Sequence, residues 1–499
     1  MTRLTRRQLL QQAGGGTLAA ASIAAGVAPV AVDAAAAQGA APAPTGPSAD
    51  VTGRLARYMV AARDRELPLQ VVLDAKARIL DTVAAIVSGS RLPPGQAAVR
   101  YVRSMGGTPE ASLLATPLRT TAVNAALANG MCAHADETDD FEPVTKAHPG
   151  CAVVPAALAM AERERRSGTD LVRAVTLGYD LCCRFLLALG PDHVRATHRS
   201  AEGTSATFGA VGAAAALARL DERNTRFALS YAAQQVSGLW SWTRDEDHIE
   251  KAFDFAGMGA RNGVTAVTMV QAGLTGVAEV LDGEHNMLIA LSSQPRPEEM
   301  VAELGTRFFV SETAIKVFSV GYPIQSPLDA LLTLRREHGL TPDNVTRLVV
   351  RLPPDAVGIV GGNAMPDVNV QHLLAVALID GTVSFEMSHS RDRMTDPQVL
   401  AVKARVQLEG DRALADPTAP RAGAVEATLR DGRVVRHLTR HPPGTKENPL
   451  RMAQVADKAR ALMAPVLGEQ AANTVISRIN AIESERDLRD FARLMRGGA

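Results

Sequence analysis

The stretch Thr207-Phe208-Gly209-Ala210-Val211-Gly212-Ala213-Ala214-Ala215-Ala216-Leu217 is composed almost entirely of Ala, Gly and Val. Ala is the strongest helix former, and a helix that is apolar on every side belongs in the interior of a protein. The small side chains of Gly209 and Gly212 leave room for neighbouring helices to approach closely. We therefore expect residues 207–220 to form a central helix of a mainly helical fold.

Helical patterns extend on both sides of this stretch. An apolar stripe with the three- and four-residue spacing of a helix that faces a core is formed by Val72, Ala75, Ile79, Val83 and Ile86. Further helices are predicted over residues 121–135, 149–165, 169–189, 224–237 and 256–272. We expect a large helical domain over residues 51–311.

The pattern changes after about Glu312. Apolar and polar side chains alternate, as is typical of strands, over residues 345–352, 399–408, 425–429 and 434–438. Asp431-Gly432 separates the last two of these runs and is a strong hairpin signal. With helices expected over 327–338 and 371–380, the pattern predicts a smaller α+β domain over residues 312–449.

Helical patterns return after Pro449, over residues 453–467 and 471–492. We expect residues 450–499 to pack back on the helical domain. The predicted fold class is therefore mainly α, with a large all-helical domain that is discontinuous in sequence and a smaller α+β domain.

The composition argues against several classes of protein. Of 499 residues, 53 are Lys or Arg and 53 are Asp or Glu, so the formal net charge is zero and no basic field for nucleic acid is present. A hydrophobic fraction of 46% excludes disorder as the main state. The four cysteines, Cys132, Cys151, Cys182 and Cys183, lack the spacing of iron–sulfur ligands, and the adjacent pair Cys182-Cys183 is expected in the core.

The N-terminus has the three parts of an export signal in order. Thr5-Arg6-Arg7-Gln8-Leu9-Leu10 is a twin-arginine signature, an apolar stretch follows over residues 14–32, and Ala35-Ala36-Ala37 offers a cleavage site. The apolar run is too short and weak to span a membrane. We predict a signal peptide over residues 1–37, a Pro/Ala linker over 38–50, and a periplasmic mature chain.

The densest polar cluster lies between two predicted helices. Asn129 to Asp140 is followed closely by His148-Pro149-Gly150, which places four carboxylates and two histidines within about 20 residues. Crowded carboxylates raise one another's pKa, which folding does not require, so a functional site is expected. Two alternatives stay open: an acidic helix-capping loop, and a metal site whose ligands would be His134, Asp136, Asp139 and His148.

Two further features suit an anionic ligand. His198 precedes Ser200, Thr204 and Ser205 at the start of the Ala-rich helix, and a helix N-terminus attracts carboxylates. Lys251 lies before a helix of small residues, and Lys316 lies where the sequence pattern changes. Either lysine is most simply a solvated surface charge, but together they would suit a polycarboxylate substrate.

These motifs resemble the MmgE/PrpD family. The resemblance rests on Asn129-Gly130, His134, Asp139-Asp140, His148-Pro149-Gly150, Pro155 to Glu162, Gly178-Tyr179-Asp180, Thr207 to Ala210, Ala260 to Gly263 and Pro327 to Ala330. It covers nearly all of residues 50–490. It implies a discontinuous helical domain, an α+β lid, a homodimer, and catalysis without a metal or an organic cofactor. Family members include 2-methylcitrate dehydratase, cis-aconitate decarboxylase and isomerases.

The resemblance also implies site residues. The predicted catalytic residues are Glu137, Asp139, Asp140, His148, His198 and Lys251. The predicted substrate-binding residues are Lys316, Gln325, Thr204 and Ser205. Three positions depart from the family: Phe141 stands where Thr is frequent, Glu137 stands where Asp is usual, and no His follows Lys316 within Ser319 to Gln325. The last departure argues against cis-aconitate decarboxylation.

The chemistry of such a substrate gives these residues roles. Removal of a proton alpha to a carboxylate needs a base, and cations must stabilise the charge that develops on that carboxylate. We expect His148 and His198 to converge on one pocket as base and acid, and the lysines to bind carboxylates. The predicted activity is a cofactor-independent dehydratase of a small di- or tricarboxylate. Alternatives are an isomerase or epimerase, a decarboxylase, or a non-catalytic periplasmic ligand-binding protein, which Phe141 supports.

The export signal gives a first prediction. Replacement of Arg6 and Arg7 by Lys should retain the precursor in the cytoplasm, because the twin-arginine pair is what the export machinery reads. Cell fractionation with immunoblotting measures this, and N-terminal sequencing of the wild-type mature chain should begin near Gln38. Normal processing of the double variant would show that another route is used.

Overall fold

Two large hydrophobic cores organise residues 50–496, the part of the chain that the computed structural model describes. The first core joins residues 51–315 to residues 455–495, and the second lies within residues 320–429. The predicted signal peptide over 1–37 and all of the linker except Asp50 lie outside the described residues. None of the helices in the described part of the chain combines the length and the apolar character that a membrane span needs.

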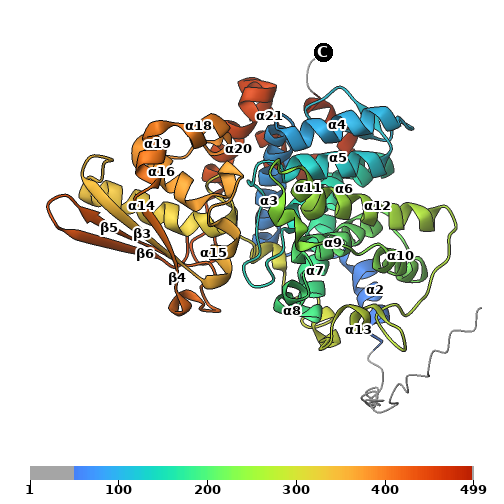
Figure 1. Ribbon diagram of the computed structural model, residues 1–499. Helices are drawn as coiled ribbons and strands as arrows, with labels where there is room; N and C mark the ends of the chain where they lie inside the picture. Colours follow the sequence, from blue (N-terminus) through green and yellow to red (C-terminus); the bar gives the residue numbers. More distant parts are fainter. Residues whose placement is uncertain (1–49, 497–499) are drawn as a thin grey trace, which may run out of the picture. The chain divides into compact units, whose positions relative to one another are not determined.

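Helix α9 (Ala201–Ala218) lies at the centre of the first core, where it packs against α7 (Gly168–Leu189), α6 (Pro149–Glu164) and α12 (Met258–Gln271) (Figure 1). All of its residues except the last are buried. It begins earlier than the sequence predicted because the Ser200 side chain caps it, accepting a hydrogen bond from the backbone N–H of Gly203. It ends at Arg219, which has a left-handed backbone conformation.

Glycines allow the central helices to touch. A Cβ added at Gly209 of α9 would lie 2.8 Å from Val153 Cγ2 and 2.9 Å from Cys182 Cβ, and one added at Gly178 of α7 would lie 2.8 Å from the carbonyl oxygen of Gly209. The backbones of α7 and α9 therefore approach more closely than any larger residue allows. All four cysteines are free and buried.

The other helices surround this centre. From the N-terminal side they are α2 (Val51–Ala62), α3 (Leu69–Gly89), α4 (Pro93–Met105), α5 (Ala122–Ala133), α8 (Pro191–Ala196), α10 (Glu222–Gln234), α11 (Ile249–Ala252) and α13 (Met287–Leu291). A π-helical turn over Phe253–Gly257 joins α11 to α12. A small ladder is formed by β1 (Ala111–Ser112) and β2 (Arg119–Thr120).

The C-terminal helices belong to the first core. They are α20 (Met452–Leu467), α21 (Glu469–Asn480) and α22 (Leu488–Leu494). Helix α20 packs against α3, and Lys458 of α20 lies 2.6 Å from Asp81 of α3. Lys458 also donates a hydrogen bond to the carbonyl oxygen of Thr138, so the C-terminal segment holds a loop more than 300 residues away in sequence.

The second core forms between one sheet and its helices. The strand order is β4-β3-β5-β6, where β3 (Val345–Leu352) pairs parallel with β4 (Val406–Gly410) and antiparallel with β5 (Gly423–Leu429), and β5 pairs antiparallel with β6 (Val434–Thr439). Helices α14 (Gln325–His338), α16 (Val370–Asp380) and α19 (Pro397–Lys403) pack together beside the sheet (Figure 1). Shorter helices are α15 (Pro354–Val360), α17 (Phe385–His389) and α18 (Arg391–Thr395).

A hairpin and a strand of the α+β part can be compared with their predictions from the sequence. The hairpin at Asp431-Gly432 is confirmed, and Gly432 has φ 88°, a conformation that favours glycine. The strand predicted over 399–408 is wrong for its first half, which is α19. Asp396 caps that helix and Pro397 opens it, and this start signal prevails over the apolar alternation.

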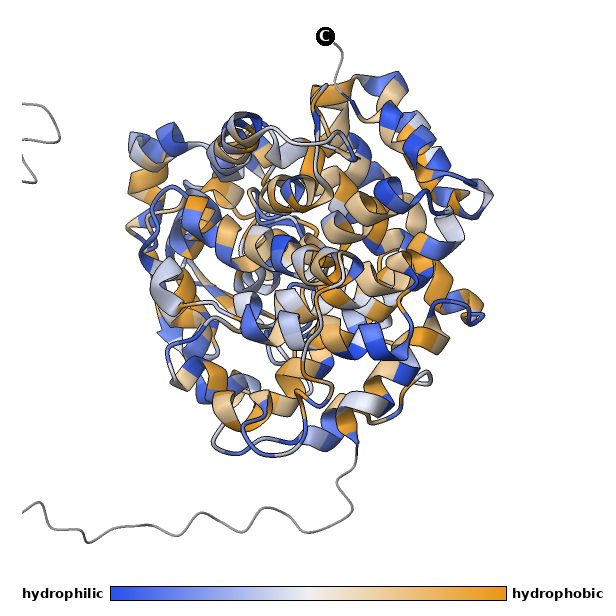
Figure 2. Ribbon diagram, turned by 90° about the vertical axis from the view of Figure 1, so that its right-hand side faces the viewer, coloured by the Kyte–Doolittle hydropathy of each residue, from blue (hydrophilic) through white to orange (hydrophobic). Residues whose placement is uncertain are grey.

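The predicted mainly-α fold with a smaller α+β part is confirmed. Figure 2 shows hydrophobic residues concentrated in the helices at the middle of the view, with hydrophilic ones more frequent towards the periphery. Phe141 and Ala314 form an antiparallel bridge and pack with Tyr322 in a small buried cluster, which brings Lys316, two residues after Ala314, towards the acidic loop.

Replacement of glycine by alanine should change the stability of the protein differently at two helical positions, because only one of them lies in the close contact of α7 and α9. Gly209→Ala should destabilise the protein by about 1–3 kcal/mol, because its Cβ has no space. Gly358→Ala, on α15, meets no atom within 4 Å and should be neutral or stabilising by up to about 1 kcal/mol through helix propensity. Urea unfolding followed by circular dichroism compares them. Equal effects would contradict the close packing of α7 on α9.

Candidate active site

The acidic loop between α5 and α6 is buried and fixed at several points. Residues 136–140 are at most 2% exposed. Asp140 accepts hydrogen bonds from the Tyr179 hydroxyl at 2.6 Å and from the Gly150 N–H at 2.9 Å, and burial raises its pKa to about 6. Glu137 has φ 54°, which is uncommon for a residue with a side chain and is typical of strained functional segments.

Asp139 holds two histidines. Its Oδ1 lies 2.9 Å from His134 Nδ1, and its Oδ2 lies 2.8 Å from His148 Nδ1. Burial alone would raise the pKa of Asp139, but His134, Lys316 and His148 hold it well below its usual range. The ionised carboxylate accepts an N–H from each Nδ1, which leaves each Nε2 available to exchange a proton.

Glu137 holds two lysines. Its Oε1 contacts Lys251 Nζ, and its Oε2 lies 3.1 Å from Lys316 Nζ, which is also 3.4 Å from Asp139 Oδ1. Burial alone would raise the pKa of Glu137, but the two ammonium groups hold it well below its usual range. Burial would lower the pKa of Lys316, but Asp139 and Glu137 outweigh burial and raise it. Both lysines are therefore buried cations rather than solvated surface charges.

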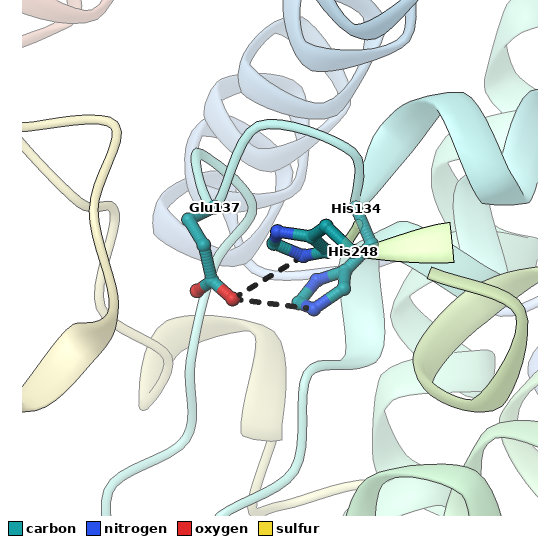
Figure 3. Close-up of side chains that lie close together, drawn as sticks. All are labelled: His134, Glu137 and His248. Carbon is teal, nitrogen blue, oxygen red and sulfur yellow. Dashed lines mark ion pairs between the residues drawn. The ribbon is translucent and has the colours of Figure 1, made fainter. Parts of the chain in front are cut away.

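A third histidine, His248, belongs to the same cluster. Figure 3 shows His134 and His248 beside the Glu137 carboxylate, whose Oε1 lies 3.6 Å from His134 Nε2 and 3.5 Å from His248 Nε2. On its other side, His248 Nδ1 lies 3.2 Å from Asp367 Oδ2. Glu137 is thus surrounded by two lysines and two histidines that come from separate segments of the chain.

Aromatic rings form the walls of the cluster. His134 stacks on Phe255 with ring centroids 4.2 Å apart, and Lys251 Nζ lies 5.1 Å from that ring and 5.0 Å from the ring of Trp242. These rings exclude water and favour the Lys251 cation. Burial lowers the pKa of His134 to about 4, so this imidazole is neutral at neutral pH.

The structure brings together five predicted residues: Glu137, Asp139, His148, Lys251 and Lys316. Asp140 is adjacent, but its carboxylate faces Tyr179 and Gly150. Gln325 is bonded to the loop after Lys316, accepting from the N–H groups of Val317 and Phe318. Thr204 and Ser205 are buried within α9, where Ser205 donates to the carbonyl oxygen of Glu202.

His198 is not in this cluster. It lies at an exposed left-handed turn between α8 and α9, with φ 60°, and its carbonyl oxygen accepts the N–H of Trp240. Within residues 50–496 its side chain has no hydrogen bond or ion pair. The expected convergence of His148 and His198 is therefore not observed here. The sequence did not point to His248 or Asp367, and it pointed to His134 as a possible metal ligand and as part of the family motif but not as a catalytic residue. His248 follows Asp245-Glu246-Asp247, a stretch that reads as a solvated loop.

Two groups of side chains have donor atoms close enough for a metal ion. They are His134, Glu137 and His248, and His134, Asp139 and His148, with donor atoms within 4.8 Å of one another. Both oxygens of Glu137 already face ammonium groups, and Asp139 faces Lys316 as well as two imidazoles. A divalent cation would be repelled by both lysines, so the charges favour proton transfer over metal binding. Asp136 faces Ser88 and the N–H of Thr138, outside both groups.

Two cavities are lined in part by Pro143 and Val144, which follow the acidic loop, and none of the cluster residues lines either cavity. The larger, about 1070 Å³, is lined from both parts of the chain, including Lys146 and Arg421. The smaller, about 310 Å³, is lined in part by Tyr322. Tyr322 stacks on Phe141 at 4.2 Å, and Phe141 in turn lies edge-on to His148 at 5.1 Å. This aromatic pair separates the smaller cavity from the histidines.

The protein thus has two hydrophobic cores and a buried site that is composed of lysines, histidines and carboxylates. Residues 53–300 match the MmgE/PrpD N-terminal domain, and residues 318–482 match the MmgE/PrpD C-terminal domain. The chain belongs to the MmgE/PrpD family.

Curated relatives match nearly the full chain. A cis-aconitate decarboxylase-like protein, oryM, of Aspergillus oryzae is 22% identical, covering 90% of this chain and 98% of the relative. A cis-aconitate decarboxylase of Aspergillus terreus is 22% identical, covering 89% and 96%. A cis-aconitate decarboxylase of Mus musculus is 23% identical, covering 86% and 89%.

The ion pairs of the cluster predict a large stability cost for one lysine. Lys316→Met leaves Asp139 and Glu137 short of a buried cation and should cost about 3–5 kcal/mol, as removal of one partner from a buried pair does. Lys446→Met, at an exposed position, should change stability by less than about 0.5 kcal/mol. Chemical unfolding at neutral pH measures both variants. A small effect at Lys316 would mean that the carboxylates are compensated in another way.

Proposed function

We propose that this protein is a lyase that acts on a small di- or tricarboxylate by acid–base chemistry, without a metal or an organic cofactor. The observation that carries the proposal is the cluster itself: two buried lysines and three histidines around Glu137 and Asp139. The family membership and the names of the curated relatives support a substrate with several carboxylates.

The cluster provides the groups that this chemistry needs. An imidazole whose Nδ1 is held by a carboxylate can take a proton at Nε2, and His148 has this arrangement with Asp139. Lys251 and Lys316 would stabilise the negative charge that develops on a substrate carboxylate. At present their partner is Glu137, so a substrate carboxylate would compete with Glu137 for the same ammonium groups.

Elimination of water is the reaction we propose first, in the manner of a 2-methylcitrate dehydratase. It needs a base for the proton alpha to the carboxylate and an acid for the departing hydroxyl, and the cluster has several imidazoles for these roles. Decarboxylation is the second candidate, and the names of the curated relatives favour it. It needs an acid that protonates the carbanion after CO₂ leaves. Isomerisation or epimerisation would use the same groups.

A panel of substrates tests the proposal. Purified protein, treated exhaustively with a chelator, is incubated with citrate, 2-methylcitrate, cis-aconitate and shorter hydroxydicarboxylates, and products are followed by proton NMR together with CO₂ release. New olefinic signals without CO₂ indicate a dehydratase, and CO₂ release indicates a decarboxylase. Exchange of solvent deuterium without either indicates an isomerase.

Three outcomes would contradict the proposal. Activity lost to the chelator and restored by one divalent ion would favour a metal site. Binding seen by calorimetry without turnover of any compound would favour the ligand-binding alternative. Neither binding nor turnover would reject polycarboxylates as the ligand class.

One variant tests the base. His148→Gln should lower kcat by about 10²–10⁴-fold on the substrate that the panel identifies, as loss of a general acid or base does. KM should change little, because His148 is not one of the carboxylate-binding cations. His285→Gln is the matched control, since the side chain of His285 is 88% exposed and lies outside the cluster. Steady-state kinetics of the two variants decide the role, and similar kcat values for both would remove His148 from the mechanism.

Two earlier expectations remain predictions from the sequence. They are export to the periplasm by the twin-arginine route and assembly as a homodimer.

A further inference from the structure

His248 and Asp367 form a buried pair whose members come from different cores. His248 precedes α11 in the helical part, and Asp367 lies in a short helical turn before α16 in the α+β part. His248 Nδ1 lies 3.2 Å from Asp367 Oδ2, and the two residues are 6% and 3% exposed. This contact is an ion pair rather than a hydrogen bond, since Asp367 Oδ2 has no hydrogen-bond partner within residues 50–496, and a carboxylate beside Nδ1 orients the ring through charge.

The other ring nitrogen of His248 faces the cluster. Its Nε2 lies 3.5 Å from Glu137 Oε1 and has no hydrogen-bond partner within residues 50–496. A buried nitrogen without a partner is costly, and such a group in a native structure calls for a functional explanation. A substrate hydroxyl beside Glu137 would provide the missing partner.

The backbone supports this orientation. His248 has φ 63°, a left-handed conformation that is strained for a residue with a side chain. Its carbonyl oxygen accepts the N–H of Ala252, so the strained residue also starts α11 and thereby sets the position of Lys251. Asp367 is fixed as well, because its carbonyl oxygen accepts the N–H of Gly321 at 2.9 Å.

The ring of His248 lies between two carboxylates. Asp367 faces Nδ1, and Glu137 faces Nε2 through the oxygen that also contacts Lys251. Burial alone would raise the pKa of Asp367, but His248 and then His389 lower it, so its carboxylate is ionised. Burial lowers the pKa of His134 to about 4, so His134 is neutral and does not suit the role of proton donor.

We propose that His248 is the general acid of the reaction and that Asp367 is its positioning residue. This inference rests on the proposed lyase function. In an elimination, His148 takes the proton alpha to the carboxylate, and the C–H electron pair forms the new double bond. The C–O pair leaves with the hydroxyl, which takes the proton from Nε2 of protonated His248 and departs as water. Transfer of the proton from His148 back to His248 through solvent completes the cycle.

Kinetics of three variants and one control test the roles. His248→Gln and Asp367→Asn should each lower kcat by about 10²–10⁴-fold, with KM within about threefold of wild type. The double variant should be no slower than the slower single variant, because two residues that act as one unit are not additive. Should Asp367→Asn fail to give the wild-type circular dichroism spectrum, Asp367→Ser replaces it.

His389 is the matched control. Its Nε2 lies 3.7 Å from the same Asp367 oxygen, but its Nδ1 bonds the carbonyl oxygen of Phe385. His389→Gln should keep kcat within about threefold of wild type. An active protein in which His248→Gln resembles His389→Gln, or in which the effects of His248 and Asp367 multiply, would overturn the inference.

A spectroscopic measurement separates this inference from the proposed function. With ¹⁵N-labelled histidine, the ring nitrogens of His248 are assigned from the signals that His248→Gln removes. Asp367→Asn should shift the His248 Nδ1 resonance, and His389→Gln should leave it in place. An unchanged resonance would overturn the pairing itself. A wild-type protein that pairs these residues but turns over no polycarboxylate would reject the lyase function and, with it, the role of His248 as acid.

Discussion

The burial of two ionised carboxylates is the constraint on which the rest of this structure depends. Glu137 and Asp139 are removed from water almost completely, and an unpaired buried charge costs several kcal/mol. Cations and imidazole N–H groups must therefore meet them, and these come from four places: the end of α5, the start of α6, the segment around α11, and the loop that leads into the second core. Lys316 lies on that loop, between Ile315 of the first core and Val320 of the second, so its ion pairs fix the segment that joins the two cores. The fold and the candidate site thus depend on the same ion pairs.

Small residues make this convergence possible. The acidic loop stays in place because Asp140 bonds Tyr179 of α7 and the first turn of α6, and both helices pack on α9. The glycine contact of α7 with α9 brings these helices close together and leaves no space for water. Larger side chains at the helix contacts would move Tyr179 relative to α6 and so disturb the acidic loop. An alanine-rich centre therefore serves the geometry of the site as well as the stability of the helices.

The sequence alone predicted the features that depend on residues close together in the chain. Apolar spacing predicted the helices, Asp431-Gly432 predicted the hairpin, and the density of charge at 137–140 pointed to the region of the site. It could not supply contacts between distant segments. His198 and His248 both precede helices, and only the path of the chain decides that the first is exposed and the second is buried beside Glu137. Asp367 carries no local signal, because its partner lies more than a hundred residues away in the other core.

Charge balance links substrate binding to proton transfer in this site. Two lysines face Glu137 and Asp139, so these four groups are neutral as a set. A di- or tricarboxylate that enters would bring two or three further negative charges into a region that excludes water, and such an excess is strongly unfavourable. Protonation of an imidazole in the cluster would compensate for this excess of negative charge. His134 resists it, because burial keeps its pKa near 4, whereas His248 lies between two carboxylates. The charge that the substrate carries would therefore favour the protonated form of the histidine that is placed to give a proton back.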